Sequence, residues 1–289
     1  MNALTEMPQL ESLADLLRGR RIVALVGAGC STESGIPDYR GPESSRRPRT
    51  PIQYQEFVRS EPARARYWAR STVGWRRIAG ARPNAAHYAL AQLEAAGALV
   101  GVITQNVDGL HDAAGSRRVV ELHGSLAAVC CLDCGDRIAR DEFQRRILEL
   151  NGEWTRQLAP VGEHAAAPDG DVDLPASALA NFRVPACEAC GTGVLKPDVV
   201  FFGENVPRAR LEEAWRVFDD GDVLLVVGSS LTVYSGRRFV YRAGEVGMPV
   251  AVMNVGPTRA DDVAAVKVEA PLGAALPSLA SLLVRESSS

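Results

Sequence analysis

Five short apolar runs, separated by stretches of helical character, constrain the fold of this chain more than any other feature. Each run is rich in Val, Ile and Leu, as expected for strands buried on both faces of a parallel sheet. The runs lie at residues 21–27, 98–106, 117–124, 222–230 and 249–256. Helices are predicted at residues 10–18, 83–97, 207–219 and 236–247. Strands that alternate with helices predict an α/β fold whose parallel sheet is covered on both sides.

The composition changes between residues 125 and 200, which indicates a second structural unit. Two cysteine pairs occur there, and residues 159–176 are rich in Pro, Gly and Asp. We therefore expect a small inserted module of irregular structure at 125–199, with a larger sheet domain formed by 1–124 and 200–289. Part of the helical region 42–82 is expected to belong to the small module.

The charge and hydropathy of the sequence limit the kinds of partner expected for this protein. The net charge of −3 gives no electrostatic indication of a nucleic-acid partner. The N-terminus carries Glu6, Glu11 and Asp15 among its apolar residues, unlike a signal peptide, and no run approaches the roughly 20 apolar residues of a membrane span. These features predict a soluble, cytoplasmic protein without a membrane partner. The lack of an evident apolar surface stripe favours a monomer.

Four of the six cysteines form two C-x-x-C pairs, Cys131 with Cys134 and Cys187 with Cys190. This is the spacing of a tetrahedral zinc site. Cys130 is a competing ligand, but only Cys131 gives the C-x-x-C spacing with Cys134. Because four thiolates leave no open coordination position, the predicted zinc is structural and contributes to folding.

The first apolar run ends in the glycine-rich sequence VGAGCSTESGIPDYR. Backbone N–H groups of Gly27, Ala28 and Gly29, at the start of a helix, would suit a pyrophosphate. A redox dinucleotide fingerprint would have a third glycine where this chain has Thr32, and a second strand close behind. From these residues alone, an ordinary strand-to-helix turn is an equal alternative.

The polar loop that follows carries Asp38 and Arg40. Arginine suits phosphate because its guanidinium donates a forked pair of hydrogen bonds. An acid nearby would accept protons from the sugar or base end of the same ligand. A solvated charged loop is the alternative interpretation.

Polar side chains follow the next two strands, at the edge of the sheet where ligands bind in doubly wound folds. The sequence TQNVDGLH places Gln105, Asn106 and Asp108 after the second strand. The sequence ELHG places His123 after the third, and an imidazole is the side chain best suited to act as a general base near neutral pH. A turn or helix cap would account for Asp108 without a ligand.

These motifs, together with KPDVVFFGE (196–204) and GSSL (228–231), occur in the order seen in sirtuins. The chain resembles that family from about residue 14 to 283, and most closely its class II branch. The resemblance implies a Rossmann-like parallel-sheet domain with a small inserted zinc-binding module, and NAD⁺ bound between them as a co-substrate. It implies an NAD-dependent protein-lysine deacetylase or deacylase, which transfers the acyl group of an acylated-lysine protein to ADP-ribose and releases nicotinamide.

Motif by motif, the resemblance also implies roles for single residues. His123 would deprotonate a ribose hydroxyl once the acyl oxygen has displaced nicotinamide. Ala28 and Arg40 would contact the phosphates, and Gln105 the ribose beside nicotinamide. The residues expected at the cofactor are Gly27, Ala28, Gly29, Ser31, Ile36, Asp38, Tyr39, Arg40, Gln105, Asn106, Asp108, Gly228, Ser229, Ser230 and Asn254.

Two further segments are expected to contact the protein substrate. Val199, Phe201, Gly203 and Glu204 match the segment that pairs with the substrate peptide in sirtuins. Tyr67 and Arg70 match a Tyr-x-x-Arg pattern of relatives that prefer acidic acyl groups, where Arg70 would pair with a carboxylate. A surface arginine on an amphipathic helix is the alternative for Arg70.

Two other functions are compatible with the same motifs. A protein ADP-ribosyltransferase would use the same first step and leave an adduct on its target. A non-catalytic module that binds NAD or ADP-ribose would need no base, so His123 argues against it. A dehydrogenase is disfavoured by the missing third glycine.

Overall fold

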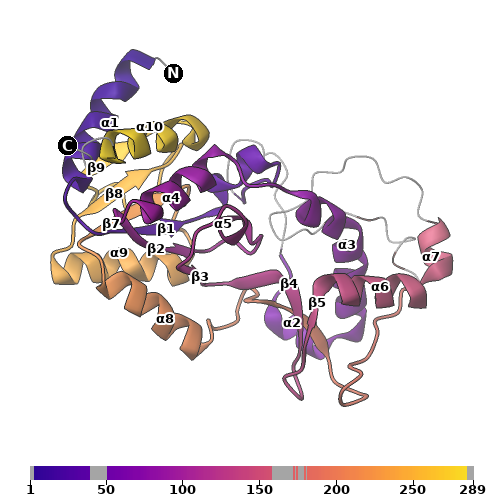
Figure 1. Ribbon diagram of the computed structural model, residues 1–289. Helices are drawn as coiled ribbons and strands as arrows, with labels where there is room; N and C mark the ends of the chain where they lie inside the picture. Colours follow the sequence, from indigo (N-terminus) through magenta and orange to yellow (C-terminus); the bar gives the residue numbers. More distant parts are fainter. Residues whose placement is uncertain are drawn as a thin grey trace.

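The computed structural model describes residues 3–39, 51–157, 172, 174, 179 and 181–284. Within these residues, six parallel strands form one sheet in the order β3-β2-β1-β7-β8-β9 (Figure 1). The strands are β1 (Ile22–Val26), β2 (Leu99–Thr104), β3 (Val119–Glu121), β7 (Val223–Val227), β8 (Val250–Met253) and β9 (Val266–Val268). The predicted α/β fold with a parallel sheet is therefore confirmed.

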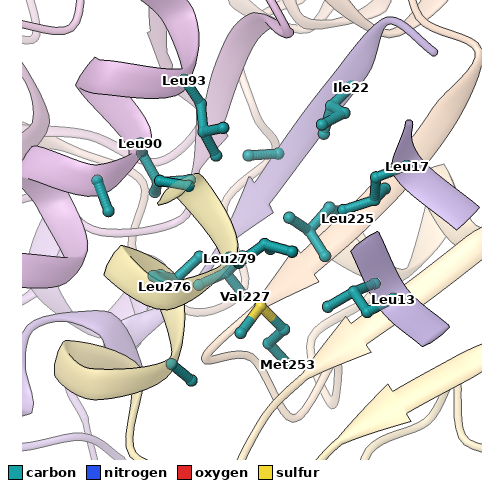
Figure 2. Close-up of a cluster of buried hydrophobic side chains, with 14 of the residues drawn as sticks. Leu13, Leu17, Ile22, Leu90, Leu93, Leu225, Val227, Met253, Leu276 and Leu279 are labelled. Carbon is teal, nitrogen blue, oxygen red and sulfur yellow. The ribbon is translucent and has the colours of Figure 1, made fainter. Parts of the chain in front are cut away.

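Helices cover both faces of this sheet, because alternate side chains of each strand face opposite ways. One face packs against α1 (Ala3–Leu17), α4 (Ala85–Ala95) and α10 (Leu272–Val284). Figure 2 shows leucines of these three helices around Ile22, Leu225 and Val227 of the strands. The other face packs against α8 (Arg208–Asp219) and α9 (Tyr234–Val246).

Three features of the domain that contains this sheet differ from the sequence prediction. Strand β9 and helix α10 are additional elements. The predicted strand 117–124 ends at Glu121, and Gly124 instead begins a strand of another sheet. Where a helix start was predicted after β1, residues 28–34 form two short 3₁₀ turns, η1 (Ala28–Cys30) and η2 (Thr32–Ser34). Gly35 (φ 82°) and Pro37 end the helical conformation there.

A smaller antiparallel sheet has the order β5-β4-β6 and lies beside helices of the first half of the chain (Figure 1). Its strands are β4 (Gly124–Cys131), β5 (Arg137–Ala139) and β6 (Leu195–Val199). Its helices are α2 (Tyr54–Arg59), α3 (Glu61–Gly80), α6 (Arg140–Leu150) and α7 (Gly152–Gln157), and the short α5 (Leu110–Ala113) lies nearer the large sheet. Within the module that was expected to be irregular, β4, β5 and α6 are regular elements, with a turn between β4 and β5.

A separate aromatic core holds the smaller sheet to α2 and α3. Phe57, Tyr67 and Phe201 meet edge to face, with ring centroids 5.1–5.6 Å apart. Trp68 is fully buried and donates from Nε1 to the carbonyl of Leu195 on β6 (3.0 Å). Helix α3 is thereby fixed against β6, which borders the candidate site. Among the described helices, none combines the length and apolar character needed to cross a membrane.

Candidate active site and metal centre

A cavity of about 1010 Å³ lies between the carboxyl ends of β1, β2 and β7 and the segment that follows β6. It brings together nearly all the residues predicted to contact NAD⁺ or the peptide. Its lining includes Gly27, Ala28, Gly29, Ser31, Ile36, Asp38, Tyr39, Gln105, Asn106, Asp108, His123, Gly228, Ser229, Ser230, Asn254, Val199, Phe201, Gly203 and Glu204. Arg40 lies outside the described residues.

The glycines of the GAG turn are required by close packing between two strand ends. A Cβ on Gly27 would lie 2.7 Å from Cβ of Ser229, and one on Gly29 would lie 2.9 Å from the carbonyl oxygen of Gly228. Both distances are shorter than real carbon contacts. The turns after β1 and β7 therefore form one continuous wall of backbone, open to a ligand on its other side.

Three polar side chains beside this wall form one network. Ser31 donates from Oγ to Oδ2 of Asp108 (2.7 Å). Asn106 donates from Nδ2 both to Oγ of Ser31 (3.0 Å) and to the carbonyl of Gly27 (3.1 Å). Asp108 also accepts at Oδ1 from the backbone N–H of Leu110 (3.0 Å). These bonds fix the carboxylate and the amide at the base of the cavity.

His123 is held at both ring nitrogens. Its Nδ1 lies 3.0 Å from the backbone carbonyl of Gln105, and its Nε2 lies 2.6 Å from Oγ of Ser235. A carbonyl only accepts, so Nδ1 carries the proton and Nε2 accepts from the serine hydroxyl. Burial, together with the positive charges of Arg210 and Arg238, lowers the pKa of His123 to about 4, although the bond to the carbonyl of Gln105 raises it. The imidazole is therefore neutral at pH 7, with its lone pair on Nε2.

The Gln105 side chain is tied to the next strand of the sheet. Its Oε1 accepts from Oγ of Ser229 (2.7 Å). A Cβ on Gly236, at the start of α9, would lie 2.5 Å from its Nε2. The Gln105 side chain is thus fixed between the carboxyl end of β7 and the start of α9, and its backbone carbonyl orients His123.

The segment after β6 also lines the cavity and is hydrogen-bonded to the backbone of the histidine. The backbone N–H of Val200 donates to the carbonyl of His123 (2.8 Å). Glu204 turns back onto its own segment, since it accepts from the N–H of Phe201 (2.8 Å) and pairs with the buried Lys196 (3.1 Å). This carboxylate stabilises the segment rather than extending from it.

The far end of the cavity contains a carboxylate that the sequence analysis did not identify. Glu269 accepts at Oε1 from the N–H of Gly256 (2.8 Å) and lines the cavity beside Asn254. Asn254 donates from Nδ2 to the carbonyls of Val255 (2.9 Å) and Gly256 (3.1 Å). The sequence predicted a role for neither Glu269 nor Ser235, because each reaches the cavity only through the packing of distant strands and helices.

Tyr67 and Arg70 do not line the large cavity. They border a separate cavity of about 270 Å³, and Pro51 and Ile52 line both cavities. Arg70 donates from Nε to the carbonyl of Val172 (2.7 Å). Arg66 and Glu56 form an ion pair across the same small cavity.

The four predicted metal ligands meet at the end of β4. The Sγ atoms of Cys131 and Cys190 lie 3.8 Å apart, and those of Cys134 and Cys187 lie 3.7 Å apart. The four sulfur atoms all lie within 4.8 Å of one another. Cys130 does not belong to this cluster.

The surroundings of the cluster fit a zinc ion. A Cβ on Gly193 would lie only 2.2 Å from Sγ of Cys131 and 2.8 Å from Sγ of Cys190, so the backbone closes tightly around the sulfur atoms. Four thiolates at this spacing form a closed tetrahedral set, which holds zinc for structure and not for catalysis. The cluster lies on the small sheet, apart from the lining of the large cavity.

The model of the Sir2 family matches residues 27–235, from the GAG turn to Ser235. The chain belongs to the Sir2 family. It is 51% identical to NAD-dependent protein deacetylase 2 of Bradyrhizobium diazoefficiens, over 92% of this chain and 96% of that protein. It is 52% identical to NAD-dependent protein deacetylase 1 of Streptomyces coelicolor, over 95% of this chain and 90% of that protein.

Solved Sir2 structures share the whole fold. A structure described as the basis for the mechanism and regulation of Sir2 enzymes has a TM-score of 0.75 and 33% identity, covering 96% of this chain and 99% of that one. A Sir2 homologue in complex with ADP-ribose has a TM-score of 0.73 and 30% identity, covering 96% of this chain and 98% of that one. The predicted relationship to sirtuins is therefore confirmed.

Proposed function

We propose that this Sir2-family chain is an NAD⁺-dependent protein-lysine deacetylase with a structural zinc. The observation that carries the proposal is the placement of His123. It is a neutral imidazole inside a cavity that combines the GAG wall, the Ser31–Asp108–Asn106 network and the segment 199–204. Relatives about 50% identical over most of the chain are named NAD-dependent protein deacetylases.

Each group of residues at the cavity has a separate role in the proposed reaction. When bound, NAD⁺ supplies a ribose carbon from which nicotinamide can leave. The GAG wall would lie against its phosphates, and Asn106 and Asp108 would surround the nicotinamide. His123 would remove a proton from a ribose hydroxyl at its Nε2 atom. The zinc, held by Cys131, Cys134, Cys187 and Cys190, would take no part in the chemistry.

The segment after β6 is proposed to hold the acylated peptide. A solved Sir2 structure is described as a complex with a p53 peptide and NAD⁺, and another with a myristoylated histone peptide. In this chain, Val199, Phe201 and Gly203 line the same cavity as the GAG wall and His123. An extended peptide that pairs with this segment would direct a lysine side chain toward His123.

Product analysis tests the proposal. The zinc-loaded protein is incubated with NAD⁺ and a panel of acyl-lysine peptides, beside His123→Ala, and the products are identified by mass spectrometry. We expect free lysine, nicotinamide and O-acyl-ADP-ribose from the wild type alone. ADP-ribose attached to a protein would favour the transferase function. Binding of NAD⁺ without any turnover would favour the binding module.

The smaller cavity supports a narrower hypothesis about the acyl group. Arg70 borders a cavity large enough for a short acyl chain and next to the large one. If its guanidinium pairs with an acyl carboxylate, Arg70→Ala loses roughly tenfold more activity on a glutaryl peptide than on an acetyl peptide. Arg66→Ala, on the same cavity, is the control for removal of a charge. Equal losses on both peptides would exclude the pairing.

We further propose that the protein works as a cytoplasmic monomer. The six cysteines form no disulfide among the described residues, and a four-thiolate cluster requires a reducing compartment. Among the exposed large apolar side chains of the described residues, Met7, Tyr88 and Val263 come from separate elements, and only α9 carries several, Tyr234, Tyr241 and Val246. Analytical ultracentrifugation of the zinc-loaded protein tests the oligomeric state.

A further inference from the structure

Ser235 is the closest side-chain neighbour of the reactive nitrogen of His123. Its Oγ lies 2.6 Å from Nε2, while Nδ1 is occupied by the carbonyl of Gln105. The lone pair of the base therefore points at a hydroxyl of this chain. Ser235 also lines the large cavity, and its hydroxyl proton is directed at the histidine.

The packing of α9 fixes Ser235 in this position. Ser235 is the second residue of the helix, and Gly236 follows it against the side chain of Gln105, with room for no Cβ. Gln105 in turn is bonded to Ser229 and to His123. His123 and its two partners, Gln105 and Ser235, therefore form one rigid unit built from separate parts of the chain.

The surroundings of the Ser235 oxygen favour a gain of negative charge. Ser235 lies in the first turn of a 13-residue helix, and the N-cap residue Val233 makes no side-chain capping bond. The positive end of the helix dipole therefore acts on the serine oxygen. Arg238, one turn later, lines the same cavity and acts on His123 by its charge. Both features lower the cost of a partial charge on Oγ during proton transfer.

We propose that Ser235 relays a proton from the ribose hydroxyl of NAD⁺ to His123. The ribose O–H proton moves to Oγ of Ser235 as the Ser235 hydroxyl proton moves to Nε2. The ribose oxygen keeps the electron pair of its broken O–H bond, and His123 becomes an imidazolium. Serine is unchanged in net protonation. The inference rests on the proposed function, since it names a second residue in the proton transfer that His123 would perform.

The first experiment needs no co-substrate. Nitrogen-15 NMR of the histidine side chains is recorded for the free wild type, Ser235→Ala and Ser235→Thr. Removal of the hydroxyl is expected to shift the Nε2 resonance of His123 and to raise its pKa, because the bond stabilises the neutral ring. Ser235→Thr should restore both values. Tyr234→Phe, which removes the neighbouring hydroxyl of the same helix, is the matched control. Identical His123 signals in wild type and Ser235→Ala would overturn the proposal.

The second experiment separates the two halves of the reaction. Exchange of labelled nicotinamide into NAD⁺ in the presence of acyl peptide reports the first step, which needs no base. Formation of O-acyl-ADP-ribose reports the step after it. Ser235→Ala is expected to keep the exchange and to lose roughly 100-fold in product formation, as a missing proton-transfer group does, with recovery in Ser235→Thr. Full product formation by Ser235→Ala would mean that the ribose displaces the serine.

A third measurement distinguishes a relay from a serine that only orients the ring. A relay moves two protons in one step. The single-turnover rate of the wild type, plotted against the fraction of D₂O in mixtures of H₂O and D₂O, should therefore follow a curve. Ser235→Ala should give a straight line. A straight line for the wild type would contradict the relay. If no peptide is turned over and no nicotinamide is exchanged, the proposed function fails, while the NMR experiment still tests the bond between Ser235 and His123.

Discussion

At the scale of single residues, the site depends on a glycine beside the base. Gly124 follows His123 and has φ of +82°, a conformation that other residues rarely adopt. It pairs with Val199 at the start of β4, so it joins the histidine to the wall of the cavity. A Cβ there would lie 1.9 Å from the carbonyl oxygen of Asp198, which is fixed backbone.

Gly124→Ala should therefore destabilise the protein by clearly more than the left-handed conformation alone costs, about 1–2 kcal/mol. We expect a large fall in the free energy of unfolding by urea and loss of turnover together. Gly97→Ala is the matched control, because Gly97 has φ of +77° but nothing within 4 Å of the added carbon. Equal losses in the two variants would show that the collision with Asp198 is relieved.

At the scale of elements, the sequence predicted what depends on local pattern. The apolar runs predicted five of the six strands of the sheet, and each observed strand is a few residues shorter than its run. Strand β9 was missed because it has three residues and its centre is Lys267. Helix α10 is apolar on most sides and contains Pro277, so it has no amphipathic pattern.

The parts of the site contributed by motifs were predictable, and those contributed by tertiary packing were not. The motif residues share the carboxyl edge of one sheet, where ligands are expected. Ser235 lies 112 residues after His123 in the sequence, and the packing of Gly236 against Gln105 brings the two side chains together. No local pattern reports such a contact. The same holds for Glu269, whose bond to Gly256 joins the ends of two neighbouring strands.

The cysteine cluster gives a prediction about the smaller sheet. Its ligands join the end of β4 to a turn about 50 residues later, so zinc closes a long loop. Cys134→Ser should lose the bound zinc and with it the hydrogen-exchange protection of β5 and the distal half of β4. The amides of β1 and β7, in their own apolar core, should remain protected.

Cys130→Ser provides the control for this experiment, because Cys130 is adjacent to a ligand but outside the cluster. Elemental analysis should find one zinc per chain in this variant, and its hydrogen-exchange protection should be close to that of the wild type. Loss of zinc in this variant, or retention in Cys134→Ser, would show that the ligand set differs from the four cysteines named here.

At the scale of the whole molecule, buried histidines set the response to acid. Burial lowers the pKa of His87, of His111 to about 3 and of His123 to about 4, and the rings of His87 and His111 lie 4.8 Å apart. In the unfolded chain each would titrate near pH 6.5. Between about pH 6.5 and 4 the unfolded chain therefore holds protons that the folded protein excludes, so stability rises with pH across this window. Burial raises the pKa of Glu121 to about 7, which acts in the opposite direction.

Two substitutions isolate these opposing groups. Lowering the pH from 7.5 to 5.5 should cost about 1.4 kcal/mol of stability for each histidine that stays neutral in the fold. His111→Gln should reduce the pH dependence of the free energy of unfolding by that amount. Glu121→Gln should make it steeper, because the folded protein then no longer gains a proton in this range. Guanidinium unfolding measures the free energy of unfolding of both variants and the wild type at the two pH values. The change with pH is then compared between proteins, so that any loss of zinc cancels. An unchanged slope in His111→Gln would mean that this imidazole is protonated in the fold, and that its packing against His87 tolerates a charge.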